Sequence, residues 1–66
     1  MKIEIIEQNE EGVSVGQILT VIGYYISDRF NKVFQINNPY DAEYLEATDE
    51  NGNMWHIYSD CWKESP

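Results

Sequence analysis

Apolar and polar residues alternate on both sides of a polar segment near the end of the chain, residues 49–53. Successive side chains of a strand point to opposite faces, so apolar residues at a spacing of two share one face. Four residues meet this condition: Leu45, Ala47, Trp55 and Ile57. The polar segment contains Asn51 followed by Gly52, which is typical of a hairpin turn. The pattern predicts a hairpin over residues 44–62 whose opposite face carries Glu46, Thr48, His56 and Tyr58.

Three other stretches of the chain also favour strands. Residues 2–7 alternate, with Ile3 and Ile5 on one face, and residues 33–36 alternate after a short basic segment. Residues 18–26 form the longest β-favouring run, and both of its faces are largely apolar. In regular alternation, one of these faces would carry Leu19, Val21, Gly23 and Tyr25. A glycine inside a strand usually marks a bulge or bend, so Gly23 should be that point.

The segments between the strands predict turns. Pro39 fixes its own φ and favours an extended Asn38, which indicates a turn over residues 37–41. Residues 59–62 are expected to form a single 3-10 turn that folds Trp62 back onto the core. A lone hairpin is marginal in water, so its apolar face must pack on the other strands. The sequence predicts one all-β domain over residues 1–66, a five-stranded sheet that curls up to hide its edges, with a C-terminal 3-10 turn.

The chain resembles the small SH3-like barrels. The motifs that carry the resemblance are Val13 to Gly16 (Val-x-x-Gly), Thr20 with Val21, the irregular stretch 27–43, Tyr44, and Asp49 to Gly52 (Asp-x-x-Gly). More narrowly, the chain is similar to short SH3-like proteins encoded by phages and prophages of Gram-positive bacteria. The resemblance covers about residues 13–63, implies a barrel, and assigns no catalytic residue. The Ala-Leu-Tyr-Asp-Tyr run of peptide-binding SH3 domains is absent, so it does not imply recognition of proline-rich peptides.

Sixty-six residues allow only a small core, worth roughly 3–5 kcal/mol. One cysteine and one histidine can form neither an internal disulfide nor a four-ligand zinc site. Nine aromatic residues are many for this length, and each can bury a large area. We therefore expect the aromatics to stabilise the fold, with Trp55, Trp62 and Phe34 in the core.

The charge is strongly acidic, with twelve Asp and Glu against four Lys and Arg and a net charge of −8. This balance disfavours direct binding to nucleic acid, because that affinity comes from basic residues that neutralise phosphates. The charge could attract a basic partner or serve solubility alone. No stretch approaches the roughly 20 apolar residues of a membrane span. We expect a cytoplasmic protein without a membrane role, and the unpaired Cys61 agrees with a reducing compartment.

Three groups of residues suggest chemistry, but each has a simpler interpretation. Asp49, Asn51 and Asn53 alternate as in a calcium loop. An EF-hand places Gly sixth and Glu twelfth, whereas here Gly52 is fourth and Asp60 is twelfth, so we favour a plain turn. Asp41 with Glu43 could act as a general acid–base pair, and Cys61 with His56 could act as a nucleophile and its base. The first pair needs a cleft and the second an orienting third group, so we expect neither catalysis nor a cofactor nor a metal.

Tyrosine supplies the remaining signal, because five tyrosines exceed what so small a core can hold. Exposed tyrosines near the irregular stretch would form an aromatic patch of the kind enriched at protein interfaces, although each could simply cover the core edge. We expect a non-catalytic protein-binding module, a monomer or a weak homo-oligomer. The predicted contact residues are Tyr24, Tyr25, Arg29, Phe30, Tyr40, Tyr44, Glu46, His56 and Tyr58.

Two alternatives belong to other functional classes. In the first, the protein is a nucleic-acid mimic whose carboxylates occupy the basic groove of a DNA-binding protein. The phosphate surrogates would be Glu4, Glu7, Glu43, Glu46, Asp49 and Glu50. In the second, the protein is an assembly subunit whose edge strands pair between copies.

Overall fold

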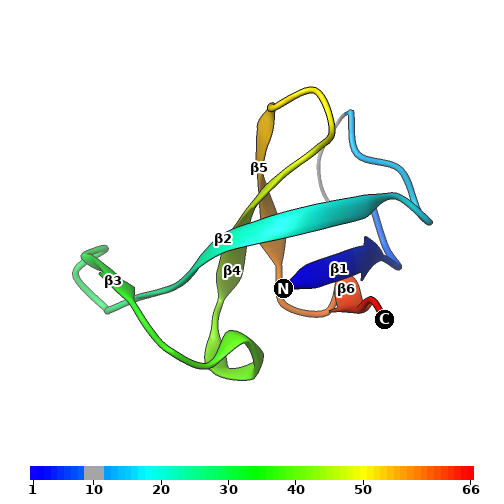
Figure 1. The fold of residues 1–66 in the computed structure, drawn as a ribbon. Helices are drawn as coiled ribbons and strands as arrows, with labels where there is room; N and C mark the ends of the chain where they lie inside the picture. Colours follow the sequence, from blue (N-terminus) through cyan, green and yellow to red (C-terminus); the bar gives the residue numbers. More distant parts are fainter. Residues whose placement is uncertain (9–11) are drawn as a thin grey trace.

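The computed structural model describes residues 1–8 and 12–66, and in this part of the chain it is an antiparallel sheet of six strands with almost no helix. The elements are β1 (Lys2–Ile5), β2 (Ile18–Ser27), β3 (Val33–Gln35), the 3-10 helix η1 (Pro39–Asp41), β4 (Tyr44–Thr48), β5 (Met54–Tyr58) and β6 (Trp62–Glu64). The strand order is β5-β4-β2-β1-β6, and β3 pairs with one end of β2 (Figure 1). The all-β prediction is confirmed. Because β5 and β6 lie at opposite ends of this order, the sheet is not closed.

The predicted hairpin is present as β4 and β5, which pair in full register, with Leu45 opposite Ile57 and Ala47 opposite Trp55. Its turn runs from Asp49 to Asn53, and only Gly52 has positive φ there, at 82°. The N–H of Gly52 donates to the carbonyl of Asp49 over 3.1 Å, as in a type I turn followed by a left-handed glycine.

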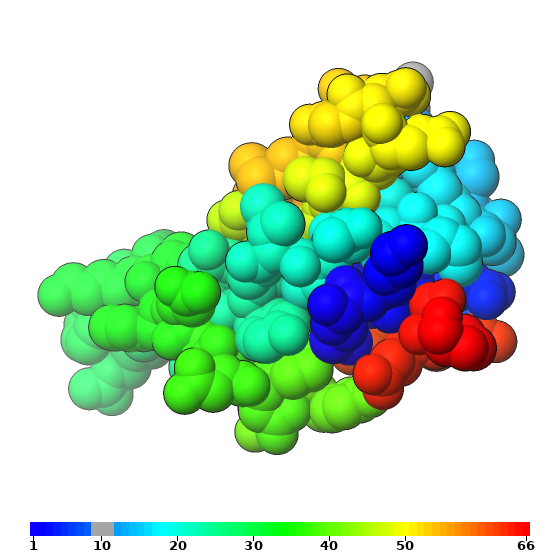
Figure 2. Space-filling view, in the orientation of Figure 1, coloured from blue at the N-terminus to red at the C-terminus, as the bar shows by residue number. Residues whose placement is uncertain are grey.

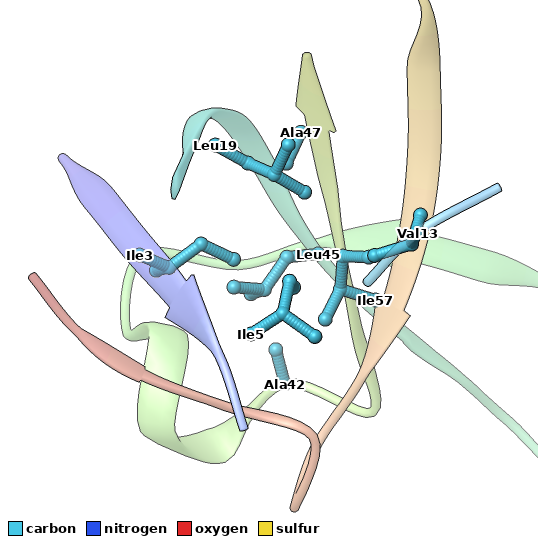
Figure 3. Close-up of a cluster of buried hydrophobic side chains, with 8 residues drawn as sticks. All are labelled: Ile3, Ile5, Val13, Leu19, Ala42, Leu45, Ala47 and Ile57. Atoms are coloured by element: carbon cyan, nitrogen blue, oxygen red, sulfur yellow. The ribbon is translucent and has the colours of Figure 1, made fainter. Parts of the chain in front are cut away.

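The core is aliphatic, which corrects the prediction of an aromatic core. Its buried members come from both ends of the chain and meet between the strands: Ile3, Ile5, Val13, Leu19, Ala42, Leu45, Ala47 and Ile57 (Figure 3). Trp55 and Trp62 are only partly buried and pack against the margin of this cluster. Phe34 is 49% exposed. Aliphatic side chains fill the small interior, and the rings of Trp55 and Trp62 cover its edge.

Strand β2 contains the expected irregularity one residue before Gly23. Val21 lies opposite Ala47 and Gly23 lies opposite Glu46, so Ile22 is an extra residue in β2. A bulge of this kind changes which residues face inward. Leu19 and Val21 pack toward the core, but beyond the bulge it is Tyr24 that does so. The regular alternation predicted for β2, with Tyr25 on the face of Leu19, is therefore wrong.

The end of β2 and β3 form a hairpin arm that projects from the rest of the molecule (Figures 1 and 2). Asp28 organises its turn, since its Oδ1 accepts hydrogen bonds from the N–H groups of Phe30 and Lys32 at 2.8 and 3.0 Å. After the arm, Asn38 is extended, as predicted, and its side chain caps η1 by accepting from the N–H of Tyr40 at 3.0 Å. The 3-10 segment thus lies at Pro39–Asp41.

The C-terminal 3-10 turn is a further correction. Residues 59 and 60 form a turn in which the N–H of Cys61 donates to the carbonyl of Tyr58 over 3.1 Å, and the chain then continues as β6. Trp62 lies opposite Ile5 on β1. Strand β6 supplies backbone hydrogen-bond partners for the edge of β1 that does not pair with β2. The local sequence does not reveal that this edge needs partners. No helix in the described part of the chain is long and apolar enough to cross a membrane.

Candidate interaction surfaces

The outer side of the sheet carries a row of tyrosines that crosses three strands. Tyr25 of β2 lies opposite Tyr44 of β4, and Tyr44 lies opposite Tyr58 of β5. Cross-strand partners on one face have their Cβ atoms within about 5.5 Å, so their rings can touch. The rings of Tyr25 and Tyr44 are stacked, with centroids 5.5 Å apart and planes inclined by 18°. Tyr58 meets Tyr44 edge-on at 6.4 Å.

The next row on the same face of these strands contains Gly23, Glu46 and His56. The His56 ring lies 4.9 Å from the ring of Tyr44, centroid to centroid. We call these two rows together the tyrosine face: Gly23, Tyr25, Tyr44, Glu46, His56 and Tyr58. Its centre is half-buried, whereas Tyr58 is 53% exposed. The rings of Tyr25, His56 and Tyr58 each contact the ring of Tyr44.

The absence of a side chain at Gly23 makes room for this arrangement. A Cβ at that position would come within 2.7 Å of the Tyr25 ring and 2.8 Å of its hydroxyl oxygen. The ring therefore lies across its own strand, above Gly23, and the stack with Tyr44 depends on that space. The sequence marks Gly23 as a bend, but its role as the floor of an aromatic surface could not be read from the pattern.

Burial among these rings raises the pKa of Tyr44 above its ordinary value of 10.0, and the carboxylate of Glu46 acts in the same direction. The Tyr44 hydroxyl thus stays protonated through the neutral range and can donate a hydrogen bond. Glu46 brings negative charge to the middle of the face. The face combines aromatic area, hydroxyl donors and one carboxylate.

Five of the nine predicted contact residues meet on this face: Tyr25, Tyr44, Glu46, His56 and Tyr58. Tyr24 does not belong to it, because its ring packs against the core and its hydroxyl lies 3.8 Å from the Met1 sulfur. Arg29 and Phe30 lie in the turn of the arm, where the guanidinium is 5.0 Å from the Phe30 ring centroid. That turn, with Phe30 69% exposed, is an apolar and basic feature of an otherwise acidic protein.

Tyr40, the ninth predicted residue, lies at a different surface. Its ring is 5.5 Å from the ring of Trp62, centroid to centroid, and its hydroxyl donates to Glu64 Oε2 over 2.8 Å. That bond is the main cause of the raised pKa of Tyr40. The two rings border a shallow pocket of about 270 Å³ between η1 and β6. The sequence did not indicate the pocket, because only the pairing of β6 with β1 brings Trp62 to Tyr40.

The carboxylates proposed as phosphate surrogates are spread over the molecule, and several serve local contacts. Asp49 Oδ2 accepts from Trp55 Nε1 at 3.0 Å, and Asp49 Oδ1 accepts from the N–H groups of Asn51 and Asn53 at 2.9 and 3.0 Å. The bond from Trp55 is the leading reason why the pKa of Asp49 lies below its ordinary 3.8. Glu43 accepts from Ser27 Oγ at 2.7 Å.

Residues considered for catalysis or metal binding make contacts that stabilise the fold. Cys61 is partly buried against the core, and burial raises the pKa of its thiol, which disfavours a thiolate nucleophile. The carboxylate of Asp49 organises the hairpin turn instead of an EF-hand loop. Among residues 1–8 and 12–66, no three His, Cys, Asp or Glu side chains gather in a way that could hold a metal ion.

No family model, no curated protein and no solved structure matches the chain.

Proposed function

We propose that the protein is a small non-catalytic binding module that contacts a protein partner through the tyrosine face. The observation that carries this proposal is the row of contacting rings of Tyr25, Tyr44 and Tyr58 on the outer side of three strands. Tyrosine is enriched at the energetic centres of interfaces, because it offers a large rigid area and a hydroxyl at a small cost in side-chain entropy.

The setting of these rings supports the same use. They stand on paired strands, so little backbone ordering has to accompany binding. Glu46 lies in the adjacent row of the tyrosine face, and the chain carries a net charge of −8, so the favoured partner is a protein with a basic surface. Long-range attraction would speed the encounter, and the rings would provide the short-range contact.

We also propose that the fold is an SH3-like barrel and that the chain is encoded by a phage or prophage. An SH3-like barrel is supported by the strand order β5-β4-β2-β1-β6, which is consecutive from β1 outward apart from the inserted β3, and by the bulge that bends β2. If the chain is a phage or prophage protein, as its sequence motifs suggest, the partner is a host protein whose activity it modulates. We also propose that the protein is cytoplasmic.

Nucleic-acid mimicry has less support. The carboxylate of Asp49 is committed to four hydrogen bonds inside its hairpin, and Glu43 is bonded to Ser27. A mimic needs carboxylates that are free to replace phosphates in regular rows. Glu46 belongs to the tyrosine face, opposite Gly23 and His56, a setting that better suits protein contact.

Quantitative affinity capture tests the proposal. Immobilised wild-type protein and a Tyr58→Ala variant are incubated with the same lysate, and each retained protein is compared by isotope ratio. The Val15→Ala variant is the control, because Val15 is 63% exposed and lies outside the tyrosine face. Loss of a well-packed interface tyrosine commonly costs about tenfold or more in affinity.

The proposal predicts a basic protein that Val15→Ala retains and that Tyr58→Ala loses. Capture that is equal for both variants, or capture abolished by moderate salt alone, would contradict binding through the tyrosine face. A Phe30→Ala variant separates the arm from the face, since Phe30 belongs to the turn of the arm.

A further inference from the structure

The pocket between η1 and β6 lies apart from the tyrosine face. Its lining residues come from three segments: Pro39, Tyr40, Ser59, Asp60, Trp62, Lys63 and Glu64. The close-up of the fold shows the coil of η1 beside β6 (Figure 3). The Tyr40 and Trp62 rings have planes inclined by 31° and centroids 5.5 Å apart. The pocket is therefore bordered by two aromatic side chains that contact each other.

The charged part of the lining has more acidic than basic side chains. Asp60 and Glu64 both line the pocket, and Glu64 is fixed by the hydroxyl of Tyr40 at 2.8 Å. Lys63 also lines the pocket, and its ammonium lies 4.0 Å from Oε1 of Glu4, a residue outside the lining. The pocket thus combines two electron-rich rings with two carboxylates.

We propose that this pocket binds an arginine side chain presented by a partner protein. A guanidinium is attracted to the faces of Trp and Tyr rings, and it also donates paired hydrogen bonds to a carboxylate. Its planar, weakly hydrated head suits an aromatic surface better than a compact, strongly hydrated ammonium does. The charge of the lining and of the whole chain complements such a side chain.

The existing bond between Tyr40 and Glu64 prepares the pocket for this use. It holds the carboxylate beside the ring, so a bound guanidinium would meet both groups without reordering either. Tyr40 is 66% exposed, so its ring is accessible. This inference goes beyond the proposed function and uses none of the residues of the tyrosine face.

Nuclear magnetic resonance of the full chain tests the proposal with a defined probe. The peptide acetyl-Gly-Arg-Gly-amide is titrated into the labelled protein, and the indole N–H signals of Trp62 and Trp55 are followed. The Trp55 indole is an internal control, because it donates to Asp49 in the hairpin turn. We expect a saturable shift of the Trp62 signal and a dissociation constant about tenfold lower than for the matched peptide with citrulline, the neutral isostere of arginine.

Variants of exposed side chains locate the site while the fold is retained. Glu64→Gln should weaken binding about tenfold, and Tyr40→Leu about two- to fivefold. Glu50→Gln removes the same charge in the hairpin turn and should leave the dissociation constant unchanged within about twofold. The assignment would be overturned if the citrulline peptide, or a matched lysine peptide, bound as tightly as the arginine peptide. It would also be overturned by equal effects of Glu64→Gln and Glu50→Gln, or by the lack of a saturable shift of the Trp62 signal. Because the readout is Trp62, failure here leaves the proposal for Tyr58 untouched.

Discussion

The ring of Tyr25 lies across Gly23 so closely that a Cβ on Gly23 would fall 2.7 Å from a ring carbon. The same ring is stacked on Tyr44. One missing side chain in the bulged strand therefore sets the position of the first ring in the tyrosine face.

The substitution Gly23→Ala should displace the Tyr25 ring. Gly23 does not have positive φ, so alanine is compatible with the backbone and its cost comes from the clash with the ring. We expect a loss of about 1–2 kcal/mol in the free energy of unfolding, measured by urea denaturation. In a Tyr25→Ala background the same substitution should cost much less, as a double-mutant cycle would report. Equal costs in both backgrounds would mean that Gly23 is needed for another reason.

The bond between Trp55 and Asp49 should make the hairpin sensitive to acid. The pKa of Asp49 is lower in the folded protein than its ordinary 3.8, so its ionised form favours folding. This contribution is fully present above the unfolded pKa and is lost as the pH falls through the folded pKa. A pH titration of the Trp55 indole N–H signal should therefore show a midpoint below 3.8.

The matched variant for this titration is Asp49→Asn, which keeps the size of the side chain but removes the charge. The urea midpoint of the wild type should fall more steeply below pH 4 than that of Asp49→Asn. Parallel acid profiles for the two proteins would show that the hydrogen bond to Trp55 does not hold the Asp49 pKa down.

The aliphatic core gives a direct stability prediction. Leu45 is fully buried on β4, opposite Ile57. Leu45→Ala should cost about 2–5 kcal/mol, which approaches the whole stability of a domain this small, so the variant should be largely unfolded by circular dichroism. Val15→Ala, at a residue 63% exposed, should change stability by less than about 0.5 kcal/mol. A folded, cooperative Leu45→Ala variant would contradict the assignment of the core.

Local patterns predicted the parts of the fold that depend on local rules. The spacing of Leu45, Ala47 and Ile57 and the Asn-Gly turn led to β4 and β5, and Ile3 and Ile5 are buried as their alternation indicated. The extended Asn38 before Pro39 is also as predicted. In each case the covalent geometry of neighbouring residues determines the outcome.

Features that depend on distant pairing were not predictable in this way. The bulge at Ile22 changes the faces of β2, so that Tyr24 packs inward and Tyr25 outward. The pairing of Trp62 with Ile5 turns an expected 3-10 turn into β6 and creates the pocket at Tyr40. The preference for aliphatic residues in the interior reflects the small space between the strands, which composition alone does not reveal.

The central claim is that the tyrosine face contacts a protein, and site-specific photo-crosslinking tests it most directly. The photoreactive residue p-benzoylphenylalanine replaces either Tyr58 on the face or Val15 outside it, each about equally exposed at 53% and 63%. Irradiation of cells that make the protein should give a discrete crosslinked species from position 58 and none from position 15. A crosslink from position 15 alone, equal crosslinks from both, or none from position 58 would contradict the claim.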